Sequence, residues 1–278
     1  KFITWNGVEE TYHAWNYTSK YEQALYGRTY NSCGVMGFDD NGKPTGYYDN
    51  QTDNYHQQNY QLIWNQRISN VLNLNVALHY THGDGYYEQY KRNRKLNNYG
   101  LGENGERGDL IEQKKMKNDF FGAVASLIYN NKKGLEAAFG GSWNKYDGDH
   151  YGNVVGVPNY EYYRNNAKKT DFNIYGKANY QFYKGLSAFV DLQYRHINYR
   201  MQDPTDMYGF NKDGQYIIDD KFNFFNPKFG LNYQINPHHQ VYASFAIAHK
   251  EPTRNDYEDN IGTELKAERL NDWEAGYK

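Results

Sequence analysis

The 278-residue sequence has little cysteine, no long apolar run and almost no net charge, and each shortage excludes a class of protein. Its one cysteine, Cys33, leaves no internal disulfide and too few thiolates for a structural zinc site. No run of about 18 apolar residues occurs, which excludes helical membrane spans. The sequence has 31 basic and 33 acidic residues, and the resulting formal charge of -2 gives no indication of a nucleic-acid partner.

Motifs of catalysis and cofactor binding are also missing. The sequence contains no Gly-x-Ser-x-Gly, no His-Glu-x-x-His and no Walker loop, so we expect neither an enzyme nor a bound cofactor. Its first residues show no basic head followed by an apolar core, so we expect no signal peptide. Since the chain opens and stops within strand-like segments, we expect an internal piece of a longer protein.

Aromatic residues are abundant where aliphatic residues are scarce. Phe, Trp and Tyr make 18% of the chain, and 31 of these residues are Tyr, whereas the whole apolar fraction is only 38%. A Tyr has an apolar body and a polar tip, which suits surfaces that are half apolar and half hydrated. Rings therefore supply much of the buried or lipid-facing surface.

Apolar and polar residues alternate with a period of two, which is the pattern of a β-strand with two different faces. Residues 72–80 place Leu72 and Leu74 on one face and Asn73 and Asn75 on the other. In residues 171–182 one row carries Asp171, Asn173, Tyr175, Lys177, Asn179 and Gln181. A row with unpaired charges cannot line a dry core. It can line a wet lumen, or face solvent as in a soluble sandwich.

This pattern predicts ten strands and one short helix. The strands are expected near residues 1–5, 52–68, 72–90, 114–131, 135–147, 168–183, 186–202, 222–235, 240–252 and 268–278. Thr18 and Ser19 precede a helical stretch at residues 20–26, where a hydroxyl can cap the first turn.

The connections between these strands are alternately short and long. Tight turns fall near residues 69–71, 131–134, 183–185 and 236–239, and long polar segments near 7–50, 91–113, 147–167 and 203–221. Such an asymmetry is typical of an outer-membrane β-barrel, with short periplasmic turns and long outer loops. A soluble sandwich would instead have tight turns at both ends of its sheets.

Five polar clusters have a structural interpretation, and some of them also have a functional alternative. The basic run at residues 91–95 is expected to be a solvated loop tip, with an anion or lipopolysaccharide contact as the alternative. Asp147, Asp149 and His150 are expected to form a polar turn, with a cation site as the alternative. Residues 39–42 and 211–214 are expected to be turns. A metal pair of His79 and His82 is disfavoured because they lie on opposite strand faces.

Four stretches, residues 75–91, 140–150, 226–256 and 265–277, resemble the barrel of TonB-dependent outer-membrane receptors, particularly the iron-complex or siderophore receptors of Bacteroidetes. The resemblance implies an all-β fold, in which residues 1–278 form about ten antiparallel strands of a transmembrane barrel of about 22. It also implies a plug domain and remaining strands that are not among these residues.

The resemblance further implies active import of a scarce nutrient across the outer membrane of a Gram-negative bacterium, most plausibly an iron-siderophore or similar metal complex. The implied partners are TonB through the plug, a small-molecule metal chelate, and outer-membrane lipid with lipopolysaccharide. Residues expected at the outer strand ends are the candidate ligand contacts: Tyr86, Tyr87, Tyr90, Tyr146, Lys250, Arg254 and Asn255. The alternatives are a soluble carbohydrate-binding β-sandwich and a passive porin-like channel.

Overall fold

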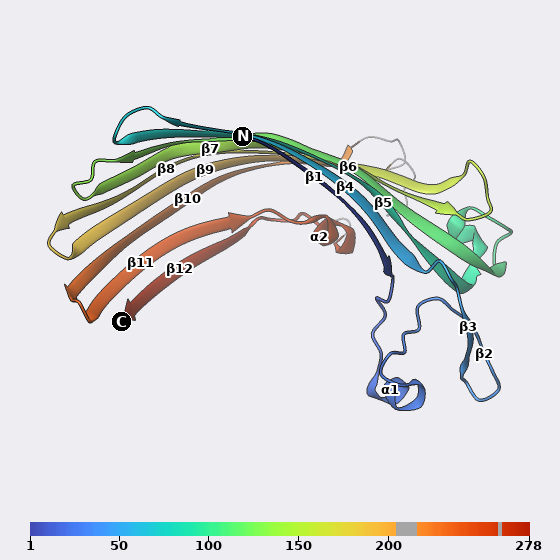
Figure 1. Ribbon diagram of the computed structural model, residues 1–278. Coiled ribbons are helices and arrows are strands. Elements are labelled where there is room, and N and C mark those ends of the chain that lie inside the picture. The colour runs from blue at the N-terminus through green and yellow to red at the C-terminus, as the bar shows by residue number, and fades with distance from the viewer. Residues whose placement is uncertain (204–215, 261–262) are drawn as a thin grey trace.

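The computed structural model describes residues 1–203, 216–260 and 263–278, and most of it is a single curved antiparallel sheet (Figure 1). Ten strands pair in the order β1-β4-β5-β6-β7-β8-β9-β10-β11-β12. Their bounds are β1 Phe2–Tyr12, β4 Thr52–Arg67, β5 Leu72–Lys95, β6 Arg107–Asn130, β7 Leu135–Val154, β8 Glu161–Tyr183, β9 Leu186–Gln202, β10 Tyr216–Asn236, β11 His239–Lys250 and β12 Glu268–Tyr277. All ten expected strands are present.

The smaller elements lie beside the long connections. They are α1 (Lys20–Tyr26), β2 (Val35–Phe38), β3 (Pro44–Tyr47), the 3-10 helix η1 (Leu96–Tyr99) and α2 (Arg254–Asp259). The expected helix at residues 20–26 is confirmed, and the Ser19 hydroxyl accepts from the backbone N–H of Glu22 at 3.1 Å. No helix of the described residues has the length and apolar character needed to span a membrane.

The sheet has two chemically different faces, because successive side chains of a strand point to opposite sides. One face carries apolar residues in register across neighbouring strands, as in the pairs of Leu127 with Leu74 and with Phe139. Its side chains stay exposed, Phe139 by 58%. We call this the apolar face. The opposite side, the polar face, carries the row that begins at Asp171, and α2 lies on this concave side (Figure 1).

The tight turns all lie at one end of the sheet and the longer connections at the other (Figure 1). Two of the turns are tight because glycines adopt backbone angles that other residues avoid: φ is +101° at Gly134 and +75° at Gly185. A Cβ at Gly185 would lie 2.3 Å from the carbonyl oxygen of Gln234. The hairpin therefore requires glycine there.

The strands are longer at the long-loop end than the sequence indicated. Most of the loops expected at residues 91–113 and 147–167 are strand instead, since β5 runs to Lys95, β6 starts at Arg107 and β7 runs to Val154. Beyond Trp143 both faces of β7 become polar, so the alternation disappears while the backbone ladder continues. Most of the loop expected near 203–221, and all of the turn expected at 211–214, lie outside the described residues, and residues 216–221 belong to β10.

Candidate binding site

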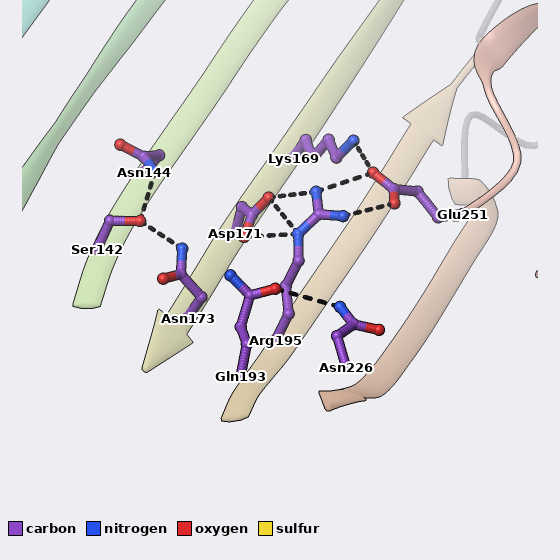
Figure 2. A network of polar contacts seen from close by, with 9 residues as sticks. All are labelled: Ser142, Asn144, Lys169, Asp171, Asn173, Gln193, Arg195, Asn226 and Glu251. Atoms are coloured by element: carbon purple, nitrogen blue, oxygen red, sulfur yellow. Dashed lines mark hydrogen bonds and ion pairs between the residues drawn. The ribbon is translucent and has the colours of Figure 1, made fainter. Parts of the chain in front are cut away.

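A network of charged side chains occupies the polar face in the middle of the sheet (Figure 2). Arg195 of β9 donates to Oδ2 of Asp171 on β8, through Nε at 2.9 Å and Nη2 at 2.5 Å. Its Nη1 donates to Oε2 of Glu251 at 3.0 Å, and Lys169 donates to the same carboxylate. Glu251 is only 8% exposed, and its two cationic partners compensate the loss of hydration.

This network fixes the segment that follows β11. Glu251 lies directly after the last residue of β11, and α2 begins three residues later at Arg254. Thr253 caps the helix, because its hydroxyl accepts from the backbone N–H of Asp256 while the Asp256 carboxylate accepts from the N–H of Thr253. Tyr257 packs on Tyr199 of the polar face with ring centroids 5.9 Å apart. The start of α2 is therefore held over the sheet.

Amide and hydroxyl groups continue the polar face toward the tight turns (Figure 2). Asn173 and Asn144 both donate to the Ser142 hydroxyl, at 2.5 and 3.2 Å, and Asn226 donates to Gln193 at 3.2 Å. Four of these residues are partly exposed and Asn226 is 8% exposed, so they surround no apolar core. The polar row expected from Asp171 onward is thus a hydrated wall.

A cavity of about 370 Å³ lies at the long-loop end of this polar face. The strand register creates it, because Asp53, Tyr87 and Lys114 are direct neighbours on β4, β5 and β6. The next row on the same face contains Met116 and His150. The complete lining is Asp53, Asn54, Tyr55, Gly85, Tyr86, Tyr87, Lys114, Lys115, Met116, His150, Tyr163, Arg254 and Asn255.

The structure brings several of the expected ligand contacts together at this cavity. Tyr87, Arg254 and Asn255 line it, although they come from β5 and from α2, far apart in the chain. Tyr86 also belongs to the lining, but strand alternation points its side chain away from that of Tyr87. Tyr146 lies beside the cavity, where burial and the neighbouring Tyr55 raise the pKa of its phenol.

Two expected contacts lie elsewhere. The Tyr90 hydroxyl donates to Asp109 at 2.5 Å, and Tyr90 lines a second cavity described below. Lys250 is exposed at the end of β11, where it pairs with Glu268 of β12. The structure therefore does not join Tyr90 and Lys250 to the cavity at Tyr87.

The cavity combines positive charge with neutral hydrogen-bonding groups. The lining contains three cations, Lys114, Lys115 and Arg254, and the single carboxylate of Asp53. Burial and the nearby Arg254 guanidinium lower the pKa of His150 to about 4, against a smaller opposite effect of Asp149. His150 is therefore neutral at pH 7. This arrangement can bind an anionic, oxygen-rich ligand through cations, phenols and an imidazole.

The possible cation site at residues 147–150 has a different structure from the one expected. These residues lie on strand β7 and form no turn. The Asp147 and Asp149 carboxylates point to the face opposite His150, where they bind Lys168 at 3.3 Å and Arg164 at 3.0 Å. Across the described ranges, no group of three or more His, Cys, Asp or Glu residues is arranged to hold a metal ion.

The remaining polar clusters have structural partners. His79 lies 2.9 Å from Oδ1 of Asn144, and His82 lies 2.8 Å from Oδ1 of Asp119, on opposite faces as the alternation predicted. The turn expected at residues 39–42 is confirmed, since Oδ1 of Asp39 accepts from the backbone N–H groups of Asn41 and Lys43. None of these groups belongs to the cavity.

Comparison with known proteins decides the family. The profile described as "TonB dependent receptor-like, beta-barrel" matches residues 4–278. The chain belongs to this family. The ten-stranded sheet is thus part of the wall of a TonB-dependent receptor barrel, and it is not closed within the described residues. A single large sheet of this family also rules out the alternative of a soluble β-sandwich.

Solved structures with a similar fold include several proteins named as transporters. The ferric citrate transporter FecA, in its unliganded form, has a TM-score of 0.62 and 10% identity, covering 86% of this chain and 34% of FecA. The copper transporter OprC has a TM-score of 0.58 and 10% identity, with coverages of 81% and 36%. The FrpB iron transporter from Neisseria meningitidis has a TM-score of 0.53 and 16% identity, with coverages of 82% and 35%.

The TonB-dependent receptor chain described here spans about a third of the length of these neighbours. At identities of 10 to 16% the likeness shows a shared barrel fold. No curated protein matches the chain by sequence.

Proposed function

We propose that this barrel segment belongs to an outer-membrane receptor that imports a metal complex with energy delivered by TonB. The observation that carries the proposal is the barrel wall of a TonB-dependent receptor with a cationic, Tyr-lined cavity at its long-loop end. The segment has the role of a wall and outer vestibule, and it carries out no catalysis.

The two faces of the sheet support an outer-membrane location. The apolar face has the exposed side chains that lipid requires, whereas the polar face can line a hydrated lumen. Rings such as Tyr80 and Tyr194 end the apolar rows of their strands, where an aromatic belt meets the headgroups and lipopolysaccharide. In this orientation the tight turns are periplasmic and the cavity at Tyr87 faces the outside.

An anionic metal chelate is the substrate class that the cavity favours. Lys114 and Arg254 provide positive charge, and Tyr55 and Tyr87 provide rings that can stack on a flat ligand. The structural neighbours named as ferric citrate, iron and copper transporters are consistent with such cargo. A passive porin-like channel is the second candidate, because an empty barrel would use the same wall.

Growth on defined iron sources tests the proposal. A strain that lacks the full-length gene is grown on a panel of ferric chelates, each supplied as the only iron source, and is complemented with the intact or an Arg254→Gln gene. We expect at least one anionic chelate to support growth only with the intact gene. Equal growth of the deleted and complemented strains on every chelate would refute metal import.

A further inference from the structure

A second cavity, of about 300 Å³, lies between the outer end of β5 and the segment that contains β2 and β3. The residues relevant to its chemistry are Trp15, Phe38, Gln89, Lys91, Arg92 and Arg94. Three of them are cations, and its described lining contains no carboxylate. In the basic run at residues 91–95, expected to be a solvated loop tip, residues 92–95 are exposed as expected, but the run lies on β5 and three of its residues line this cavity.

A β-bulge directs two of these cations to the same side. Lys91 pairs with Leu110 and Arg94 pairs with Gly108. The chain therefore advances three residues on β5 over the distance that it advances two residues on β6. Asn93 has a φ of 49°, and its backbone N–H donates to Asp109 at 2.8 Å. Without the bulge Lys91 and Arg94 would point to opposite faces, since they are three residues apart.

Aromatic rings lie against two of the three cationic groups, Lys91 and Arg92. Nζ of Lys91 lies 5.7 Å from the ring of Trp15, and the Arg92 guanidinium lies 5.3 Å from the ring of Phe38. Lys91 also forms an ion pair of 3.3 Å with Glu112, which lies outside the cavity lining. A guanidinium stacked on a ring keeps its N–H groups available at the edge, where they can bind an oxyanion.

The cavity wall also contains an unsatisfied acceptor. Gln89 is 1% exposed, and its Nε2 lies 3.3 Å from Nδ1 of His13. Its Oε1 is buried and has no hydrogen-bond partner within the described residues. A buried carbonyl without a donor is energetically unfavourable. A ligand with a hydroxyl group can supply that donor.

We propose that this cavity is a second ligand site, specific for a soluble oxyanion that carries a hydroxyl group. Arg92, Arg94 and Lys91 bind its carboxylate or phosphate oxygens, and the hydroxyl donates to Gln89. The site is separate from the cavity at Tyr87, with which it shares no lining residue. The rings of Tyr87 and Trp15 nevertheless lie in tilted contact with centroids 5.8 Å apart, so the two sites are neighbours.

The position on β5 favours a soluble ligand over a lipid headgroup. The apolar row of β5 ends at Tyr80, and Lys91 follows eleven residues later. At about 3.3 Å per strand residue this separation is roughly 36 Å along the strand. Phosphates of the membrane surface lie near the end of the apolar row, so they cannot reach this cavity.

Citrate and tricarballylate are suitable probes, because both carry three carboxylates and only citrate has a hydroxyl. Binding to the full-length protein is measured by calorimetry in metal-free buffer that contains a chelating resin. We expect citrate to bind at least tenfold more tightly than tricarballylate. Gln89→Met is expected to abolish this preference, and the Arg92→Gln/Arg94→Gln double variant to weaken citrate binding at least tenfold.

A matched control makes the outcome decisive. Lys95→Gln removes a cation of the same run that does not line the cavity, and is expected to change citrate binding less than twofold. The far-UV circular dichroism of each variant establishes that it is folded. Absence of citrate binding to the folded parent protein, or equal weakening by Lys95→Gln, would overturn the proposal, whether or not the protein imports metal.

Discussion

Arg195 and Glu251 lie 56 positions apart in the sequence, yet their side chains meet at 3.0 Å on the polar face of the sheet. The same guanidinium binds Asp171, so one arginine joins two neighbouring strands to the segment that starts α2. Because α2 carries Arg254 and Asn255 into the cavity at Tyr87, this ion pair positions the candidate binding site.

Removal of the arginine should release α2. Arg195→Ala leaves the nearly buried Glu251 with only one cationic partner, which we expect to cost about 3 kcal/mol locally. Hydrogen exchange of the backbone amides at residues 254–259 should accelerate on the order of a hundredfold. Arg200→Ala is the control, because its ion pair with Asp219 is exposed and worth less than about 1 kcal/mol. Equal acceleration in both variants would contradict the positioning role.

The low pKa of His150 makes the cavity sensitive to acid. The folded-state pKa is about 4 and the ordinary value is 6.5, so the unfolded state binds the proton first as the pH falls. The contribution of His150 to stability should therefore be constant above pH 6.5 and be lost as the pH falls from 6.5 to 4. A pH titration of the His150 imidazole resonance by nuclear magnetic resonance should give the low pKa. The resonance is assigned by its absence from the spectrum of His150→Gln. Arg254→Ala should raise it, and an unchanged value would refute the influence of that cation.

The glycine at the β8–β9 turn should tolerate no side chain. Gly185→Ala places a Cβ 2.3 Å from the carbonyl oxygen of Gln234 at a φ of +75°, so the hairpin must shift as well as bear about 1–2 kcal/mol of backbone strain. Gly105→Ala is the control, since its φ is +90° but nothing lies within 4 Å. The urea midpoint of the refolded barrel should fall more for Gly185→Ala. A larger effect of Gly105→Ala would be the contrary result.

Ligand affinity should distinguish the residues that line the cavity from those that do not. Arg254→Gln removes a lining cation and should weaken binding of the transported chelate at least tenfold, because an arginine-to-carboxylate contact contributes about 1.5–3 kcal/mol. Lys250→Gln removes an exposed cation outside the lining and should change affinity less than twofold. Quenching of intrinsic Trp and Tyr fluorescence measures both. Similar losses would indicate attraction by overall charge alone.

Much of the fold can be predicted from the sequence, because a strand with one apolar and one polar face alternates apolar and polar residues. Leu72–Tyr80 and the row from Asp171 revealed their strands for this reason. The tight turns even fix the register: Arg67 pairs with Asn73, and the same pairing carried outward sets Asp53 opposite Tyr87. Extending that register to β6 would have placed Lys114 beside Tyr87.

The long-loop end of the sheet was harder to predict, because both faces of its strands are polar there and the residues no longer alternate. Nothing in residues 147–154 alternates, so a turn was expected where β7 continues. The contact of Arg254 with the cavity depends on the ion pair of Arg195 with Glu251, which no local pattern encodes. The bulge at Asn93 likewise depends on the distant Asp109 carboxylate.

Uptake of the radiolabelled ferric chelate that supports growth tests the central claim most directly. Initial rates are compared in cells that produce the full-length receptor with and without TonB, with surface binding measured in parallel. We predict that loss of TonB abolishes uptake and leaves binding unchanged. Equal uptake rates with and without TonB would show passive passage and contradict energised transport.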